Sequence, residues 1–134
     1  MEMRSIVKAP HLNSIMDFPT LATFISAFSF LFYGTSCVST AHMKKEFQRF
    51  GYPRQRLLTG YLQLLGAAGL IIGYAFAPIL ALISSIGLSL MMTFGFYVRL
   101  RIRDPLIAAS PALIYALLNI YLSIHYTRIV FMAN

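Results

Sequence analysis

The sequence predicts an all-α fold, a bundle of four transmembrane helices, and three observations support it. First, 58% of the 134 residues are hydrophobic and only 11% are charged, whereas charged residues make up about a quarter of a soluble domain. Second, four stretches of bilayer length contain no Lys, Arg, Asp or Glu. Third, a soluble chain this short buries too little of its surface to hide so many apolar side chains. We therefore expect the lipid bilayer to cover them.

The four predicted spans are residues 20–41, 57–77, 79–98 and 106–127. Each has the length of about 20 residues that an α-helix needs to cross the hydrocarbon core. The connection between the second and third spans is so short that these helices must form an antiparallel hairpin. Residues 1–19 are polar and mixed, and we expect them to form either an interfacial or a disordered segment before a single four-helix domain of residues 20–134.

Residues 42–50 are predicted to continue the first helix beyond the membrane. Three apolar side chains recur there at helical spacing among charged ones, Met43, Phe47 and Phe50. Gly51 is the predicted C-cap, because glycine readily adopts the left-handed backbone that ends many helices. Farther along, Asp104 is the predicted N-cap of the fourth helix, since aspartate is favoured at that position.

The basic residues are concentrated in two short segments. Eight of the eleven Lys and Arg residues lie in 44–56 and 99–103, and the net charge is +7. Each segment is flanked by uncharged runs of bilayer length, so we interpret it by the positive-inside rule and expect no nucleic-acid partner. The loops of residues 42–56 and 99–104 hold eight basic residues against three on the other side. This predicts that both loops are cytoplasmic, in a plasma or inner membrane.

Three stretches carry a family resemblance. They are FSFLFYG at residues 28–34, MKKEFQRFGYPRQRLLTGYLQLLGAAGLIIG at 43–73 and GLSLMMTFGFYVRLRIRDP at 87–105. Together they resemble the DoxX-like family of small four-helix membrane proteins. The resemblance implies the four-helix fold, and relatives in this broad group suggest a membrane component of a quinone-linked oxidoreductase system. The chain departs from the disulfide-handling branch, because Cys37 is its single cysteine and a resolving thiol is missing.

Several polar side chains lie inside the predicted spans. An unpaired amide in lipid is costly, so Gln63 and Asn119 should face the bundle interior. Two interpretations stay open, hydrogen bonding between helices and a cleft that binds a quinone or another lipid-like molecule. The candidate cleft residues are Tyr33, Gln63, Tyr115, Asn119 and Ser123.

Four glycines lie within the second span and are candidates for close helix packing: Gly60, Gly66, Gly69 and Gly73. Gly69 and Gly73 form a small-xxx-small pattern, which lets helix backbones approach closely. This contact can form inside the bundle or between two copies of the chain, so a homo-oligomer is one candidate assembly.

The charged loop residues are candidates for ion pairs between loops, or for contacts with anionic headgroups. They are Glu46, Arg49, Arg56, Arg99, Arg101 and Arg103. Glu46 is expected to pair with Arg56 or with the arginines of residues 99–103. His42 lies on the same helix face as Glu46, but two ligands are too few for a metal site, so none is predicted.

No recognisable catalytic set is visible in the sequence. We find no nucleophile elbow, phosphate loop or dinucleotide fingerprint, and therefore expect no catalytic activity of the chain alone. The leading hypothesis is a non-enzymatic membrane subunit that binds a partner membrane protein or a lipid-like or quinone molecule within the bundle. The alternatives are a membrane component of a quinone-linked oxidoreductase and a small transporter or channel.

Overall fold

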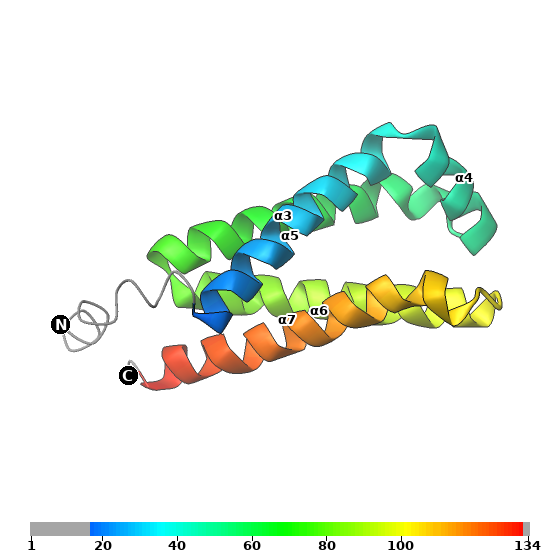
Figure 1. The fold of residues 1–134 in the computed structure, drawn as a ribbon. Coiled ribbons are helices and arrows are strands. Elements are labelled where there is room, and N and C mark those ends of the chain that lie inside the picture. The colour runs from blue at the N-terminus through cyan, green and yellow to red at the C-terminus, as the bar shows by residue number, and fades with distance from the viewer. Residues whose placement is uncertain (1–16, 133–134) are drawn as a thin grey trace.

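The computed structural model describes residues 17–132, which are helical apart from short connections. The elements are α3 (Phe18–Ser39), α4 (Ala41–Phe50), the short 3-10 helix η1 (Pro53–Gln55), α5 (Arg56–Phe76), α6 (Pro78–Arg101) and α7 (Leu106–Met132) (Figure 1). Four of these segments are long and apolar enough to cross a membrane. The predicted all-α bundle of four transmembrane helices is confirmed. Residues 1–16 of the predicted interfacial segment lie outside the described residues, and its last residues, Phe18 and Pro19, belong to α3.

The first helix ends earlier than the sequence suggested. α3 stops at Ser39, and Thr40 has an extended backbone with φ −102° and ψ 146°. The Thr40 hydroxyl then accepts a hydrogen bond from the Met43 backbone N–H at 3.2 Å, which makes Thr40 the N-cap of α4. The prediction of one continuous helix to Phe50 is therefore wrong. α4 is a separate helix that turns away from α3, while its predicted C-cap at Gly51 has the expected left-handed backbone, with φ 91°.

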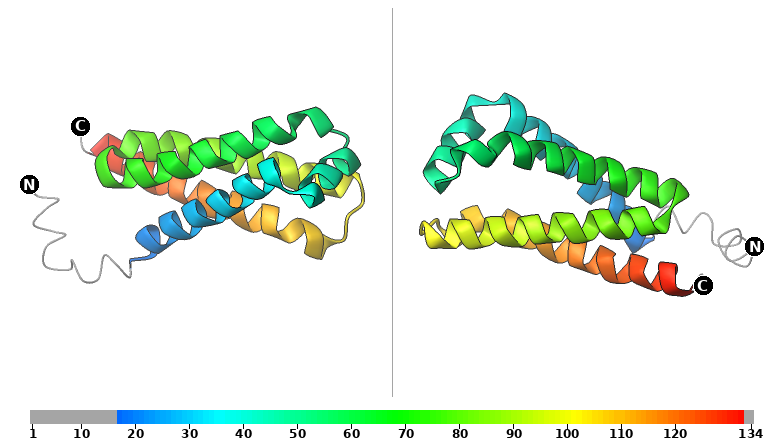
Figure 2. Two further views of the ribbon diagram at one scale, coloured as in Figure 1. Left: turned by 90° about the horizontal axis from the view of Figure 1, so that it is seen from above. Right: turned by 180° about the vertical axis from the view of Figure 1, so that it is seen from behind.

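The four long helices form a wedge. α3 packs along α5, α6 packs along α7, and α5 joins α6 through the short turn at Ala77. The two pairs lie close together near this turn and diverge toward the end that carries α4, as two opposite views show (Figures 1 and 2). At the wide end of the wedge, α4 and side chains of the long helices fill the space between the two helix pairs.

Small residues set the narrow end of the wedge. Gly69 and Gly73 are buried, and a side chain at either position would collide with Ser84 or Ala81 of α6. Gly66 also faces α6, at Leu88. The small-xxx-small face is therefore occupied inside the chain, and it gives no support for a homo-oligomer.

At the other side of α5, Gly60 meets Gly34 of α3. A Cβ at Gly34 would lie 2.9 Å from the Gly60 carbonyl oxygen, and a Cβ at Gly60 would lie 3.0 Å from the Gly34 carbonyl oxygen. Two glycines in register let the backbones approach closely. Gly34 thus acts as a packing glycine too, although it was not among the four predicted from the sequence.

Side-chain hydrogen bonds join α3 to α7 near the narrow end. The pairs are Thr23–Tyr126 at 2.6 Å, Ser26–Asn119 at 2.9 Å and Ser29–Tyr115 at 2.7 Å. Because lipid offers no hydrogen-bond partner, such bonds satisfy polar groups that would otherwise destabilise the bundle. They fix how α7 crosses α3 and hence where the wedge begins to open.

Candidate functional site

A cavity of about 460 Å³ lies at the wide end of the wedge, beneath α4. Its volume falls within the range of about 300–1,000 Å³ that is usual for small-molecule sites. α4 covers it with its apolar side chains, Met43, Phe47 and Phe50. The apolar spacing seen in the sequence of residues 43–50 is thus explained by this contact, and no charged side chain of α4 is among the described residues that line the cavity.

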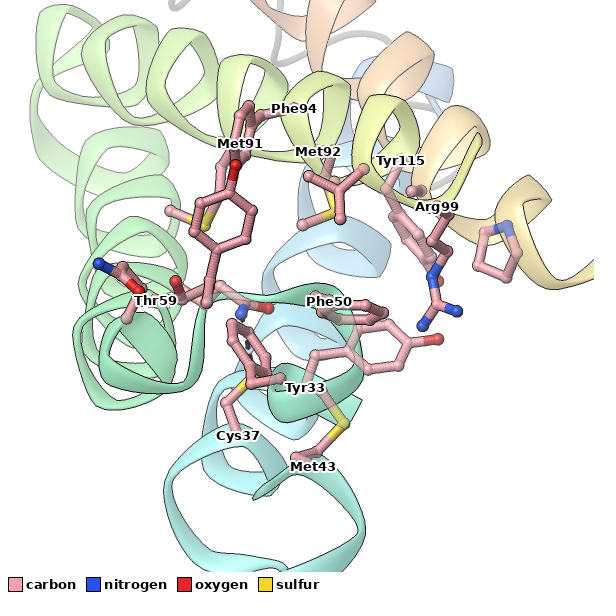
Figure 3. A pocket seen from close by; sticks show the side chains of 18 of the residues that line it. Tyr33, Cys37, Met43, Phe50, Thr59, Met91, Met92, Phe94, Arg99 and Tyr115 are labelled. Carbon is pink, nitrogen blue, oxygen red and sulfur yellow. Dashed lines mark hydrogen bonds between the residues drawn. The ribbon is translucent and has the colours of Figure 1, made fainter. Parts of the chain in front are cut away.

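Methionine and aromatic side chains form much of the wall (Figure 3). Met91, Met92 and Phe94 come from α6, and Tyr115 comes from α7. Methionine is flexible and polarisable, so it adapts to apolar ligands of different shape. The wall therefore suits a hydrocarbon or ring system better than a polar solute.

Gln63 brings an amide into this apolar wall. Only 3% of the residue is exposed, and its Nε2 donates to the Cys37 Sγ at 3.3 Å, a weak acceptor. Among residues 17–132, no group donates a hydrogen bond to its Oε1 atom. Gln63 therefore retains hydrogen-bonding capacity at the cavity, toward a hydroxyl or amine through Oε1 and toward a carbonyl through Nε2.

Three of the five predicted cleft residues meet in the lining, Tyr33, Gln63 and Tyr115. The Tyr33 and Tyr115 rings contact edge to face, with centroids 5.9 Å apart, and the Tyr115 hydroxyl bonds to Ser29 at 2.7 Å. These two rings form the wall between α3 and α7. Gln55 of η1 and Thr59 of α5 add further polar atoms to the lining.

Asn119 and Ser123 lie outside the cavity lining, contrary to the cleft predicted from the sequence. Asn119 is fully buried and exchanges hydrogen bonds with Ser26 of α3. Ser123 bonds to Ser85 of α6 at 3.1 Å. The i, i+4 spacing placed Tyr115, Asn119 and Ser123 on one face correctly, but α3 and α7 close on each other along that face. Only its Tyr115 end reaches the cavity.

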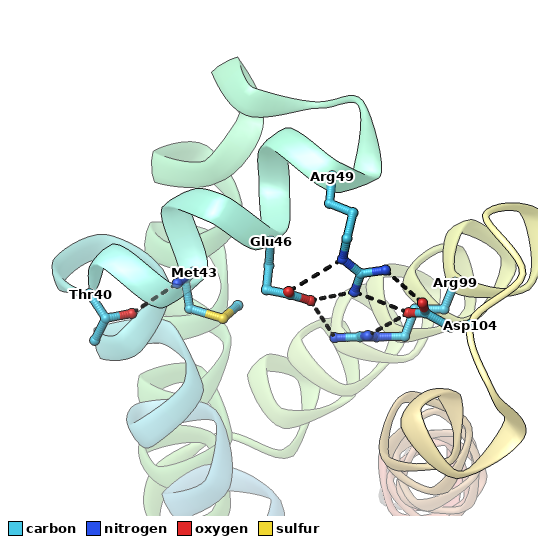
Figure 4. Close-up of polar contacts among 6 residues, drawn as sticks. All are labelled: Thr40, Met43, Glu46, Arg49, Arg99 and Asp104. Atoms are coloured by element: carbon cyan, nitrogen blue, oxygen red, sulfur yellow. Dashed lines mark hydrogen bonds and ion pairs between the residues drawn. The ribbon is translucent and has the colours of Figure 1, made fainter.

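Four charged residues hold α4 over the cavity, and we call them the charge cluster: Glu46, Arg49, Arg99 and Asp104 (Figure 4). Arg49 donates to Glu46 and to Asp104, each at 2.6 Å. Arg99 donates to Asp104 at 2.8 Å and approaches Glu46 at 3.8 Å. The cluster therefore links α4 to the end of α6 and to the turn before α7.

The carboxylates of the charge cluster are stabilised in their ionised form. Hydrogen bonds from Arg49 hold the pKa of Glu46 and of Asp104 below their ordinary values, and Arg99 acts in the same direction. The Arg49 and Arg99 guanidinium groups also lie over the Phe50 ring, 5.4 Å and 4.9 Å from its centroid. Cation–π contact of this kind adds to the ion pairs and anchors an aromatic residue of the cavity lining.

Glu46 approaches Arg99, one of the partners expected for it, at 3.8 Å, whereas two other expectations, for Arg56 and for Asp104, differ from the structure. Arg56 does not pair with Glu46 but donates to the carbonyl oxygens of Cys37 and Val38, at 2.7 Å and 3.0 Å. A cation is favourable there, because these carbonyls carry the negative end of the α3 dipole. Asp104, predicted as an N-cap, directs its carboxylate to the two arginines of the charge cluster instead.

Of the remaining predicted arginines, Arg101 is the last residue of α6 and Arg103 lies in the turn before α7. The Arg101 guanidinium stacks over the Tyr52 ring at 5.8 Å, and Tyr52 lines the cavity. Arg103 is exposed and has a left-handed backbone with φ 65°. In the described part of the chain, no three His, Cys, Asp or Glu side chains cluster as metal ligands would.

The sequence model of the DoxX-like family matches residues 21–121. The chain belongs to the DoxX-like family. The match contains α3 to α6 except the first residues of α3, and it reaches the middle of α7. With four apolar helices of spanning length, this DoxX-like protein is a multi-pass integral membrane protein. We found no match to it among curated proteins or solved structures.

Proposed function

We propose that this DoxX-like protein is a membrane subunit that binds a lipid-like small molecule in the cavity beneath α4, a quinone being one candidate. The observation that carries the proposal is the cavity itself, about 460 Å³ in volume and walled by methionine and aromatic side chains. The amide of Gln63 supplies a polar contact in an apolar wall, the combination typical of small-molecule sites. Such a site binds and orients a molecule without a catalytic group.

We further propose that the end carrying α4 faces the cytoplasm of a plasma or inner membrane. Residues 42–56 and 99–104 carry eight Lys and Arg residues against two acidic ones, and the positive-inside rule favours the cytoplasm for such loops. The cavity then lies in the cytoplasmic half of the bilayer. A lipid-like ligand would reach it from the inner leaflet.

The chain offers a matched pair of variants to test the cavity. Gly95 and Gly87 both lie in α6, and a Cβ built at either meets no atom within 4 Å. Gly95 lines the cavity, whereas Gly87 does not. Gly95→Phe should fill the site, while Gly87→Phe should place the same ring outside it, so both variants share the change in helix propensity.

The experiment is mass spectrometry of small molecules retained by protein purified in mild detergent. We expect a stoichiometric lipid or quinone with the wild type and with Gly87→Phe, and its loss with Gly95→Phe. Equal retention by all three proteins would contradict the proposal, because the molecule would then bind elsewhere. A co-purifying membrane protein without any small molecule would also contradict it and would assign the chain to a scaffold role.

A further inference from the structure

We infer that the cavity selects an amphiphile with an anionic headgroup, a carboxylate or a phosphate, which binds Arg99 while its tail occupies the space beneath α4. The inference rests on the proposed function and specifies the class of its ligand. Three features carry it: the place of Arg99 in the lining, its unused hydrogen-bonding edge, and the excess of positive charge around the cavity mouth.

Among residues 17–132, Arg99 is the single charged residue of the cavity lining. Its side chain is 25% exposed and reaches from α6 toward Phe50, as Figure 3 shows. A charge interacts more strongly with an opposite charge at such a partly buried site than in bulk water. Guanidinium also matches the geometry of carboxylate and phosphate groups. The lining thus places one strong anion-binding group at the end of an apolar chamber.

The charge cluster does not use Arg99 fully. Its NH1 donates to Asp104 at 2.8 Å, but its NH2 lies 3.8 Å from the nearest Glu46 oxygen, beyond hydrogen-bonding distance. Guanidinium has five N–H donors, and within the described residues the Arg99 guanidinium donates one hydrogen bond, to Asp104. An anionic headgroup can therefore bind the second edge, in competition with Glu46.

The charge around the mouth favours the same class of ligand. The charge cluster is neutral as a set, yet the surrounding loops carry six further Lys and Arg residues and no further acid. Among them, Arg101 lies over the Tyr52 ring that lines the cavity. Such a field attracts anions to the mouth and disfavours cations. A neutral amphiphile with the same tail gains no affinity from this positive field.

The test compares ligands that share one tail and differ in headgroup. We would measure binding of radiolabelled palmitate to the protein in neutral detergent at mildly alkaline pH, with hexadecyl phosphate and hexadecanol as competitors. The anionic ligands should bind roughly ten- to a hundredfold more tightly than hexadecanol, because a hydrogen bond to a charged group contributes about that much affinity. The ratio of palmitate to hexadecyl phosphate then shows which anionic headgroup the site prefers.

Two variants separate headgroup binding from a structural role of Arg99. Arg99→Gln should lower palmitate affinity to that of hexadecanol and leave hexadecanol unchanged, whereas the control Arg103→Gln should keep the preference. Glu46→Gln removes the competing carboxylate and should raise palmitate affinity several-fold. A merely structural charge cluster predicts the opposite sign, because loss of Glu46 would then weaken the site.

The outcomes distinguish this inference from the proposed function. Equal binding of palmitate and hexadecanol, both lost with Gly95→Phe, would overturn the anionic preference and leave the cavity as a lipid site. A neutral quinone retained by the purified protein and not displaced by palmitate would overturn it as well. Failure of every ligand to bind, together with no retained molecule, would refute both.

Discussion

Substitution of Gly73 by alanine tests whether the narrow end of the wedge depends on direct backbone contact. A Cβ at Gly73 would lie 2.7 Å from the Ala81 Cα and 2.8 Å from its Cβ. Carbon atoms in contact lie about 3.5–4.0 Å apart, so α5 and α6 would have to separate by about 1 Å. Ala81 has no long side chain that could rotate away. Overpacking of this kind costs about 1–3 kcal/mol.

The matched control is Gly87→Ala, because a Cβ there meets no atom within 4 Å. Alanine is favoured over glycine in a helix by about 1 kcal/mol at both positions, so this contribution cancels in the comparison. We expect Gly87→Ala to be slightly more stable than the wild type. Gly73→Ala should be about 1–3 kcal/mol less stable than Gly87→Ala.

The assay is equilibrium unfolding by sodium dodecyl sulfate in mixed micelles, followed by circular dichroism. Cys37 provides an independent readout, because it is the single cysteine of the chain and is only 2% exposed. Although Cys37 borders the cavity, its burial should make the thiol react slowly with a bulky fluorescent reagent in the folded bundle and much faster when the bundle opens. Equal free energies of unfolding for the two variants would refute the reasoning that α5 and α6 are in direct backbone contact at Gly73.

Two further predictions concern the cover of the cavity and the polar contact of α7. Because arginine partners lower both pKa values, the folded charge cluster favours the ionised carboxylates, and its stabilisation is lost only as the pH falls below the ordinary pKa values of the Glu46 and Asp104 carboxyl groups. The rate of backbone hydrogen exchange in residues 41–50, corrected for its intrinsic pH dependence, should be constant from neutral pH down to these values and higher below them. A rate that already rises near neutral pH would contradict the conclusion that the charge cluster holds α4 in place. A double-mutant cycle of Asn119→Ala and Ser26→Ala on the free energy of unfolding should give a coupling energy of about 0.6 kcal/mol and at most about 1.7 kcal/mol. Both variants should still retain the ligand of the cavity. A coupling energy of zero would show that the hydrogen bonds between Asn119 and Ser26 do not stabilise the bundle.

The spans could be predicted from the sequence because each depends on a local property. Length, absence of charge and the short connection before Pro78 require four crossings and one hairpin, whatever the helices pack against. The bounds of α6 and α7 extend beyond the predicted spans, to Arg101 and Met132, because helix continues past the apolar stretch. Composition reports where lipid covers a helix, and it does not report where the helix ends.

The partners of individual residues could not be predicted, because they depend on how the helices cross. Gly69 and Gly73 identified a close-packing face but not whether α6 or a second chain occupies it. Asn119 shares a face with Tyr115, yet α3 closes over one and leaves the other at the cavity. The break before α4 did have a local signal, since Thr40 is a favourable N-cap residue, but the helical spacing on both sides of it concealed the turn.

The most direct measurement of the central claim is photocrosslinking with a photoreactive methionine analogue in native membranes. Met43, Met91 and Met92 line the cavity, whereas Met132 is 82% exposed and reports ordinary contact with bulk lipid. We predict that peptides carrying the three cavity methionines acquire one recurring small-molecule adduct, distinct from the mixed lipids on Met132 and lost with Gly95→Phe. Unlabelled cavity methionines beside a labelled Met132 would contradict the claim that this cavity holds a ligand.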